Sequence, residues 1–227
     1  MKYLVCFFDS SMQLVPREIA SHPQVVKDAS RKGKKPFETM LERGRHHNAI
    51  LMLKNSEKRG RPDILHTCLN IISDSPLYKR GLMDVIVHTI EGKWIIFNDK
   101  IRFPVTYYNF IGLMEKLLID GKIVDPSGRI LIEVASKEQA LEIIETFTHK
   151  TMLSESGMKI EIGEYIDRIV KMGKPTCFFI GAYPKGKPSR EILEMADEEI
   201  SIYDEILTAW TVTAWLTYEL FKHVTSL

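Results

Sequence analysis

The stretch Thr176-Cys177-Phe178-Phe179-Ile180-Gly181-Ala182-Tyr183-Pro184-Lys185-Gly186 decides the fold. It begins as an apolar run of strand length and then opens into a loop marked by glycines. An acidic segment that favours a helix follows, then a second short apolar run at 200–203 and the start of a final helix at 206–211. Two strands that each lead through a loop into a helix are typical of a parallel sheet. Such sheets bind small polar ligands at their carboxyl edge.

The rest of the chain alternates strand and helix patterns, which indicates one α/β fold. Apolar runs that are continuous rather than alternating favour strands covered on both faces. We expect strands at Tyr3–Phe8, Met83–Val87, Trp94–Phe97, Ile130–Val134, Cys177–Ile180 and Ile200–Tyr203. Apolar residues spaced near 3.6 predict helices around 64–72 and 110–118, and further helices are expected at 137–146, 164–171 and about 208–224. The sequence therefore predicts a sheet with helices on both faces.

Composition sets limits on class and location. With 227 residues, 44% hydrophobic and 27% charged, the chain is long enough for a single large domain spanning 1–227. No stretch reaches the roughly 18 apolar residues of a membrane span, and Asp9 interrupts the apolar start, so we expect a cytoplasmic protein without a membrane partner. Cys6, Cys68 and Cys177 are isolated within apolar runs. They are interpreted as buried hydrophobic residues, and no metal site is predicted.

The net charge of +1 hides a strong local asymmetry. Residues 27–61 hold eleven Lys and Arg against four acids, a local charge of +7, whereas 190–205 holds seven acids against one Arg. The basic stretch, interpreted as a basic loop region, would attract phosphates and permits an RNA partner. A solvated, partly mobile loop is an equally good interpretation of this charge run.

The final helix is apolar on two faces. Leu207, Trp210, Ala214, Tyr218 and Phe221 form one face, and Val212, Leu216 and Leu220 form another. Two apolar faces require two surfaces to bury against. The helix is therefore either a central core helix or the contact of a homodimer.

A second block, Arg61-Pro62-Asp63 followed by an apolar helix and Ser73-Asp74-Ser75-Pro76-Leu77, combines a cation with a carboxylate at a helix start. Asp63 could simply cap the helix. Alternatively, a carboxylate beside a guanidinium fixes a flat donor fork that can bind a phosphate or a base edge with two hydrogen bonds.

A third block runs from Asn98 to Met114 and places Lys100, Arg102 and the aromatic residues Tyr107 and Tyr108 ahead of a helix. Cations next to aromatic rings suit a splayed-out RNA base, which stacks on a ring while its backbone meets charge. The aromatic residues could instead pack in the core, and we expect this for Phe110.

The three blocks in this order resemble the nucleolar essential protein 1 family. These are pseudouridine N1-methyltransferases of the SPOUT class that act in small-subunit ribosome biogenesis. The resemblance covers about 61–221, and richness in Lys, Glu and Ile resembles archaeal members. It implies a parallel sheet with a C-terminal trefoil knot, S-adenosylmethionine as cofactor, small-subunit ribosomal RNA as substrate and a homodimer. Ribosomal proteins or other assembly factors are further possible partners.

Residue by residue, the resemblance implies a cofactor site and an RNA site. The cofactor site would hold Gly181, Gly186, Ile202, Tyr203, Asp204, Glu205, Ile206, Leu207 and Thr151. The RNA site would include Arg61, with Asp63 holding it or assisting proton removal from the base, and Arg102, Val105 and Asn109. Family members commonly carry Arg at those last three positions, and this sequence keeps only Arg102. Lys100 or the basic stretch could compensate for the two lost cations.

Two other functions fit the same residues. A non-catalytic assembly factor could bind ribosomal RNA and keep the cofactor pocket as part of the fold. A methyltransferase of the same class could act on another uridine-type base or on transfer RNA.

Overall fold

A computed structural model describes residues 2–98 and 100–225. Their strands are β1 (Tyr3–Ser10), β2 (Met83–Thr89), β3 (Trp94–Phe97), β4 (Lys122–Val124), β5 (Ile130–Ala135), β6 (His149–Lys159), β7 (Thr176–Gly181) and β8 (Glu198–Ser201). Their α-helices are α1 (Pro23–Lys32), α2 (Arg43–Ile50), α3 (Pro62–Asp74), α4 (Pro76–Lys79), α5 (Tyr107–Asp120), α6 (Lys137–Glu145), α7 (Ile162–Met172), α8 (Arg190–Leu193) and α9 (Ala209–Thr225). Short 3-10 helices lie at Arg17–Ile19, Pro36–Glu38 and Ser56–Lys58.

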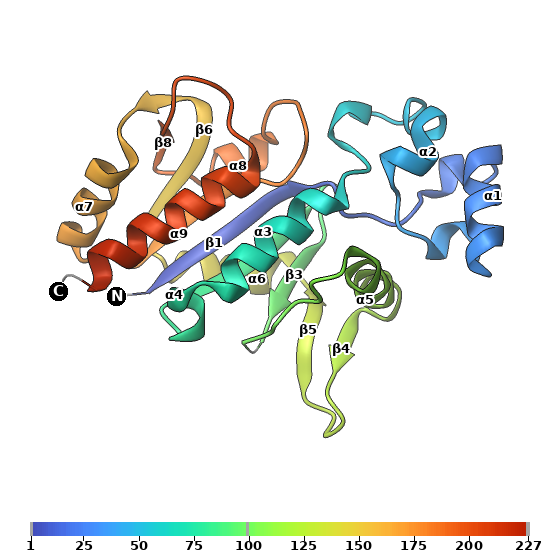
Figure 1. The fold of residues 1–227 in the computed structure, drawn as a ribbon, viewed down its shortest axis with the longest axis horizontal. Coiled ribbons are helices and arrows are strands. Elements are labelled where there is room, and N and C mark those ends of the chain that lie inside the picture. The colour runs from blue at the N-terminus through green and yellow to red at the C-terminus, as the bar shows by residue number, and fades with distance from the viewer. Residues whose placement is uncertain (1, 99, 226–227) are drawn as a thin grey trace.

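All eight of these strands form one sheet in the order β4-β5-β3-β2-β1-β7-β6-β8 (Figure 1). The half from β2 to β8 is parallel, as the sequence predicted. The other half is antiparallel, because β3 follows β2 through a turn too short for a crossover. The expected parallel sheet is therefore a mixed sheet.

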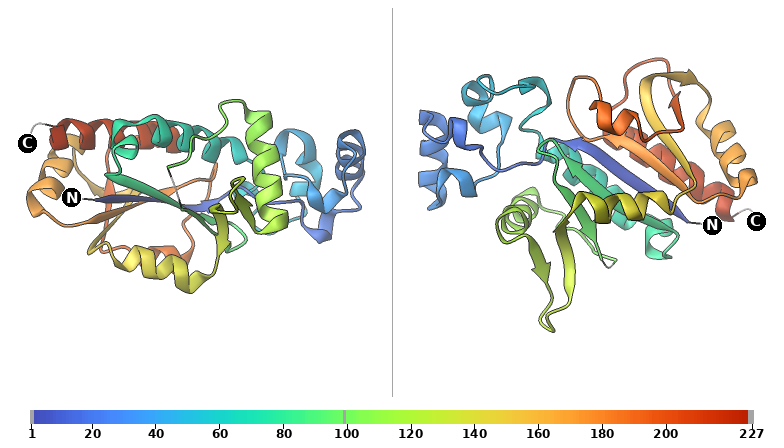
Figure 2. Two further views of the ribbon diagram at one scale, coloured as in Figure 1. Left: turned by 90° about the horizontal axis from the view of Figure 1, so that it is seen from below. Right: turned by 180° about the vertical axis from the view of Figure 1, so that it is seen from behind.

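Helices cover the sheet on both faces, as expected. Seen edge-on in Figure 2, α3 and α9 lie on one face and α6 lies on the other. Along β1, Tyr3, Val5 and Phe7 face the first layer, whereas Leu4 and Cys6 face the second. The whole of β1 is buried, which confirms that this continuous apolar run is a strand covered on both sides. All three cysteines are buried as well.

The sequence located most strands, but it misplaced the end of β8 and missed two other strands. β3 has the predicted bounds, whereas β8 ends at Ser201, so Ile202 and Tyr203 belong to the loop that follows it. β4 and β6 were not predicted. Their burial is low or interrupted, and β6 carries a polar stretch around Ser154–Ser156 that hides the strand pattern.

The basic stretch at 27–61 is not a loop, and this prediction was wrong. It belongs to a helical insert, residues 14–61, which contains α1, α2 and the 3-10 helices. The insert has a small core of its own, and a bridge between Leu14 and Met40 closes its base. Its core residues are Val15, Ile19, Val25, Leu41, Ala49 and Ile50. Except for the buried Lys58, the basic residues lie at the surface of this folded unit. The unit lies beyond one end of the sheet (Figure 1).

Helix α9 contributes to the core on one face only. Leu216 and Leu220 are buried, but Tyr218 is 61% exposed and Trp215 is 37% exposed. Helix α9 lies against α3 and α7 (Figure 1). Among the described residues, no helix is long and apolar enough to cross a membrane.

Gly157 marks a close crossing of β6 over β8. Leu153 and Met158 both pair with Ile200, so the residues between them form a bulge. A Cβ at Gly157 would lie 2.4 Å from the nitrogen of Ile200 and 2.5 Å from its carbonyl carbon. Only glycine allows the two main chains to approach so closely.

We predict that Gly157→Ala lowers the free energy of unfolding by about 2 kcal/mol, the cost of overpacking a site that cannot yield. Gly112→Ala in α5 is the matched control, because a Cβ there meets nothing within 4 Å. The control should gain about 0.5–1 kcal/mol from the higher helix propensity of alanine. Urea denaturation of both variants measures the two effects, and equal stability of Gly157→Ala and the native chain would contradict the close crossing.

Candidate functional site

A cavity of about 320 Å³ opens at the carboxyl edge of the parallel half of the sheet. The loops after β7 and β8 and the beginning of α9 surround it. Most of the residues expected at the cofactor site line it: Gly181, Gly186, Ile202, Tyr203, Glu205, Ile206 and Leu207. The volume suits a small organic ligand, and the lining mixes apolar side chains with glycine main chain.

Two of the expected residues lie elsewhere. Asp204 points into solvent, where its carboxylate binds Lys159 at 2.7 Å. Thr151 is fully buried in β6 and its hydroxyl contacts that of Tyr165, which also donates to Glu198 at 2.7 Å. Neither side chain lines the cavity, so neither is placed to contact a ligand there.

Other lining residues were missed from sequence. Leu153, Ser154 and Glu155 come from β6, a strand without a clear pattern, and Trp210 comes from the first turn of α9. Tyr183 lies within the glycine loop and could have been included on that ground. The Tyr183 ring also explains why residue 181 is a glycine, because a Cβ at Gly181 would lie 2.9 Å from this ring.

A buried ion pair holds the loop after β7. The carboxylate of Asp9, at the end of β1, accepts from Lys58 Nζ at 2.8 Å and from the Ser189 N–H at 2.8 Å. The Lys58 ammonium also lies over the Tyr183 ring at 4.5 Å. Lys58 belongs to the helical insert, so this pair joins the insert to the wall of the cavity.

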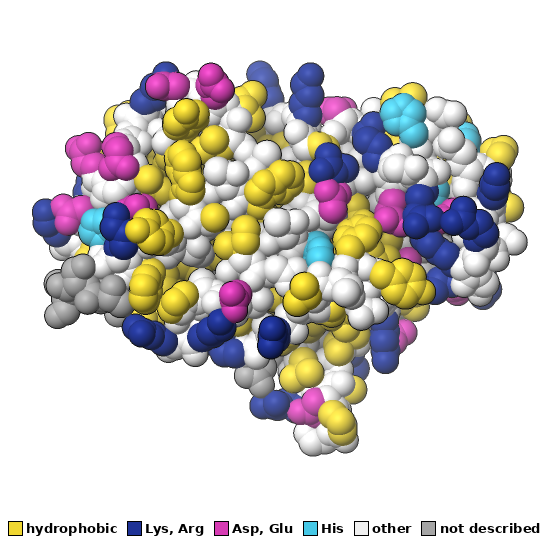
Figure 3. Space-filling model, viewed as in Figure 1, with side chains coloured by type: hydrophobic (Ala, Val, Ile, Leu, Met, Phe, Trp, Pro, Cys, Tyr) yellow, Lys and Arg dark blue, Asp and Glu magenta, His cyan; other side chains and the backbone are white. Residues whose placement is uncertain are grey.

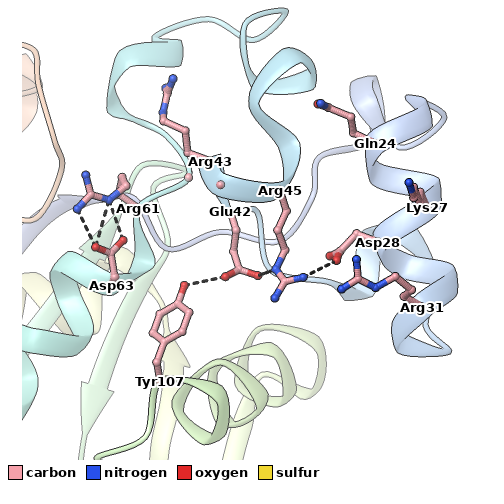
Figure 4. A pocket seen from close by; sticks show the side chains of 12 residues that line it. Gln24, Lys27, Asp28, Arg31, Glu42, Arg43, Arg45, Arg61, Asp63 and Tyr107 are labelled. Atoms are coloured by element: carbon pink, nitrogen blue, oxygen red, sulfur yellow. Dashed lines mark hydrogen bonds and ion pairs between the residues drawn. The ribbon is translucent and has the colours of Figure 1, made fainter.

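A second and larger depression, of about 750 Å³, lies between the helical insert and the start of α3 and α5 (Figure 4). We call it the basic cleft. Its lining residues are Gln24, Lys27, Asp28, Arg31, Glu42, Arg43, Gly44, Arg45, Gly60, Arg61, Asp63 and Tyr107. Lys and Arg side chains gather over this end of the molecule on the face drawn in Figure 3.

Arg61 lines both the basic cleft and the cavity. Its Nε lies 2.9 Å from Asp63 Oδ1, and its Nη2 lies 2.7 Å from Asp63 Oδ2. Asp63 is not the cap of α3, since Arg61 occupies that position and no side chain caps this end. The bidentate pair instead fixes the guanidinium plane and leaves its Nη1 side without a partner among the described residues.

The remaining expected RNA contacts lie outside the lining of the cleft. Arg102, Val105 and Asn109 are exposed, with Val105 at 71%. Arg102 lies near Asp74, at the far end of α3 from Arg61, and helps to lower the pKa of that carboxyl after Lys79, which is the main cause. The ammonium of Lys100, a cation that could compensate for the two lost ones, binds Asp84 at 2.7 Å and the Met83 carbonyl at 2.9 Å.

The aromatic residues of the third block divide between core and surface. Phe110 is buried, as predicted, and Tyr108 is 84% exposed. Tyr107 donates its hydroxyl to Glu42 at 3.0 Å, and burial together with this contact raises the pKa of Tyr107. In the described part of the chain, no group of His, Cys, Asp and Glu is arranged to hold a metal ion.

The cavity lies at the carboxyl edge of a parallel sheet, and Arg61 joins it to a cationic cleft. These two sites define a protein that brings a small organic ligand next to a polyanion. Comparison with known proteins gives the family. The model of the EMG1/NEP1 methyltransferase family matches residues 5–220, and the chain belongs to this family.

Relatives and a solved structure agree with this assignment. The chain is 39% identical to the ribosomal RNA small subunit methyltransferase Nep1 of Staphylothermus marinus, covering 91% of this chain and 89% of the relative. It is 41% identical to the protein of the same name from Saccharolobus solfataricus, covering 87% of each. The crystal structure of Archaeoglobus fulgidus Nep1 bound to S-adenosylhomocysteine matches over 100% of both chains, with a TM-score of 0.87 and 34% identity.

The Asp9 carboxyl makes stability depend on pH in the acid range. Burial alone would raise its pKa, but His88, Lys58 and the Ser189 N–H outweigh burial and lower the pKa to about 2. The unfolded value is about 3.9. A lowered folded pKa stabilises the protein above the unfolded pKa, and this contribution is lost as the pH falls through the folded pKa.

We therefore predict that the native chain loses about 2 kcal/mol of stability more than Asp9→Asn does between pH 5 and pH 2. Denaturant titrations of both proteins across this range measure the difference. If the free energy of unfolding fell with pH equally in the two proteins, Asp9 would not be held as an anion by its neighbours.

Proposed function

We propose that this protein uses S-adenosylmethionine to methylate small-subunit ribosomal RNA, at N1 of a pseudouridine. One observation carries the proposal: Arg61 lines both the cavity and the basic cleft. The substrate base and the methyl donor have to meet at one point. Arg61 stands where a ligand in the cavity and a strand in the cleft would meet.

The cavity suits the cofactor. Ile202 and Leu207 offer apolar surfaces for the adenine, and Gly181 and Gly186 allow main-chain groups to come close to a polar ligand. Gly186 has a φ of +119°, which side chains rarely adopt, so the loop depends on glycine there. When bound, the cofactor supplies a methyl group on an excellent leaving group. The similarity to Archaeoglobus fulgidus Nep1, whose crystal structure contains bound S-adenosylhomocysteine, supports this choice of cofactor.

With such a methyl donor, the protein mainly has to align the base. Arg61 presents the free side of its guanidinium to a phosphate or a base edge, and Asp63 keeps that plane fixed. Both carboxylate oxygens of Asp63 are engaged by Arg61, which favours an orienting role over proton removal.

The wider proposal follows family membership. We propose that the chain has the SPOUT architecture with a C-terminal trefoil knot, acts in the cytoplasm during ribosome assembly and meets other assembly factors there. The names of the relatives, which specify ribosomal RNA of the small subunit, support ribosomal RNA over transfer RNA.

The test is methyl transfer from labelled S-adenosylmethionine to two RNA hairpins that differ only by uridine or pseudouridine in the loop. We predict label in the pseudouridine hairpin alone. Label in the uridine hairpin would reject the base specificity. Label in neither, with cofactor binding measured separately, would favour the non-catalytic assembly factor.

The variant Arg61→Lys tests whether the activity depends on the proposed site. It keeps the charge but loses the flat fork, so methyl transfer should fall by roughly a hundredfold or more, in line with the loss of one preorganised donor. Affinity for S-adenosylhomocysteine should change less than about threefold. Arg190→Lys is the control, since Arg190 is 91% exposed and binds only Glu194 among the described residues.

We further propose a homodimer that uses α9 and the loop before it. Tyr203, Ile206, Trp215 and Tyr218 expose large apolar side chains there, with Ile206 at 80%. The rings of Tyr203 and Trp215 pack edge to face at 5.8 Å, and exposed large apolar side chains of this kind are typical of a protein interface. Figure 3 shows hydrophobic side chains over α9, toward the end of the molecule opposite the basic end in the same view.

Tyr218→Asp should convert the dimer to a monomer, because it places a charge in the apolar contact. Light scattering after gel filtration would report half the mass of the native protein. Tyr108→Asp is a control of equal chemistry at a side chain that is 84% exposed, far from α9. A native chain that elutes as a monomer would reject the interface.

A further inference from the structure

Most cations of the helical insert are committed to the fold. Lys58 binds Asp9, Lys34 binds Glu115, and Arg45 binds both Asp28 and Glu42. Lys32 also binds Asp28, at 2.8 Å. Partners inside and outside the segment therefore engage most of these cations, and only a few cations remain for a ligand.

Two of the remaining cations face the basic cleft. Lys27 and Arg31 line it, both are exposed, and neither has a carboxylate partner within residues 2–98 and 100–225. They stand four residues apart on α1, so they lie on the same side of that helix, about 6 Å apart along its axis. Arg31 reaches from α1 toward the centre of the cleft (Figure 4).

The acids of the cleft do not cancel these charges. Asp28 is paired with Lys32 and Arg45, Glu42 with Arg45, and Asp63 with Arg61. Arg43 adds a further positive charge, because its guanidinium donates to the neutral carbonyls of Ser56 and Arg59. The cleft thus carries an excess positive charge that is concentrated on the α1 side.

We propose that Lys27 and Arg31 form a phosphodiester subsite, which binds the RNA strand next to the methylated nucleotide. The subsite rests on the proposed function, because it takes the target base to lie at Arg61. A strand that leaves the base there enters the cleft directly, since Arg61 lines both spaces. Two cations one helical turn apart then meet successive phosphates, and they replace the cations missing at Val105 and Asn109.

The test compares the double variant Lys27→Gln/Arg31→Gln with a control, Lys35→Gln/Lys54→Gln. The control removes the same charge from the same insert, at exposed positions that do not line the cleft. RNA affinity of each protein is measured against salt, with a pseudouridine hairpin that has single-stranded flanks. Losing two single-strand phosphate contacts should lower the slope of log Kd against log salt by about 1.4. The control should keep the native slope.

A second measurement locates the phosphates. Single methylphosphonate linkages, which are uncharged, are placed in turn along the flanks of the target nucleotide. At two neighbouring linkages the native protein should lose affinity and the double variant should not, while S-adenosylhomocysteine binding stays the same in both. Variant and control with equal slopes, or a native protein that tolerates every neutral linkage, would overturn the subsite.

The outcomes separate this subsite from the proposed activity. A native protein that binds RNA through Lys27 and Arg31 but transfers no methyl group supports the subsite and rejects the activity. Methyl transfer by a double variant with native RNA affinity rejects the subsite alone. No binding of RNA by the native protein rejects both.

Discussion

The buried ion pair between Asp9 and Lys58 is the interaction on which the site depends. Asp9 ends the central strand β1, Lys58 comes from the helical insert, and the Ser189 N–H brings in the loop that follows β7. Both side chains are almost completely buried, at 4% and 9% exposure. Removing one partner of such a pair costs about 3–5 kcal/mol, because the other charge is left without compensation.

Several smaller contacts reinforce this junction. The Ser11 hydroxyl donates to the Lys58 carbonyl. Asp9 adopts a φ of +48° at an irregularity of β1, after which Ser10 still pairs with Thr89 of β2. On the other side of the insert, Glu115 of α5 accepts from the Met40 N–H at 2.7 Å and from Lys34. The insert is thus attached at both ends of the basic cleft, so the width of the cleft is set before any ligand enters.

The sequence located the parts of this molecule that depend on local pattern. Continuous apolar runs predicted the central strands, and the three motif blocks predicted Arg61, Asp63 and seven of the residues that line the cavity. It failed where tertiary contacts decide. The polar residues of β6 hide a strand that only its neighbours β7 and β8 stabilise. The basic stretch was predicted to be a loop because its helices are short and contain few apolar residues. Its fold depends in part on paired charges, which the sequence pattern does not reveal. Asp204 and Thr151 belong to segments that border the cavity, but their side chains point elsewhere. The direction of a side chain cannot be predicted from a motif.

The position of β1 in the sheet has a consequence for how the chain folds during its synthesis. This strand leaves the ribosome before the other strands of the sheet, yet it lies at the centre of the sheet and pairs on one side with β7, at 176–181. At a synthesis rate of about 5–20 residues per second, its partner follows roughly ten seconds or more later. During that time a strand with six consecutive apolar residues has an open edge, which favours association with other chains. Early pairing with β2 would protect one edge of this strand, and early folding of the helical insert would protect one end. The other edge stays open until β7 has been synthesised.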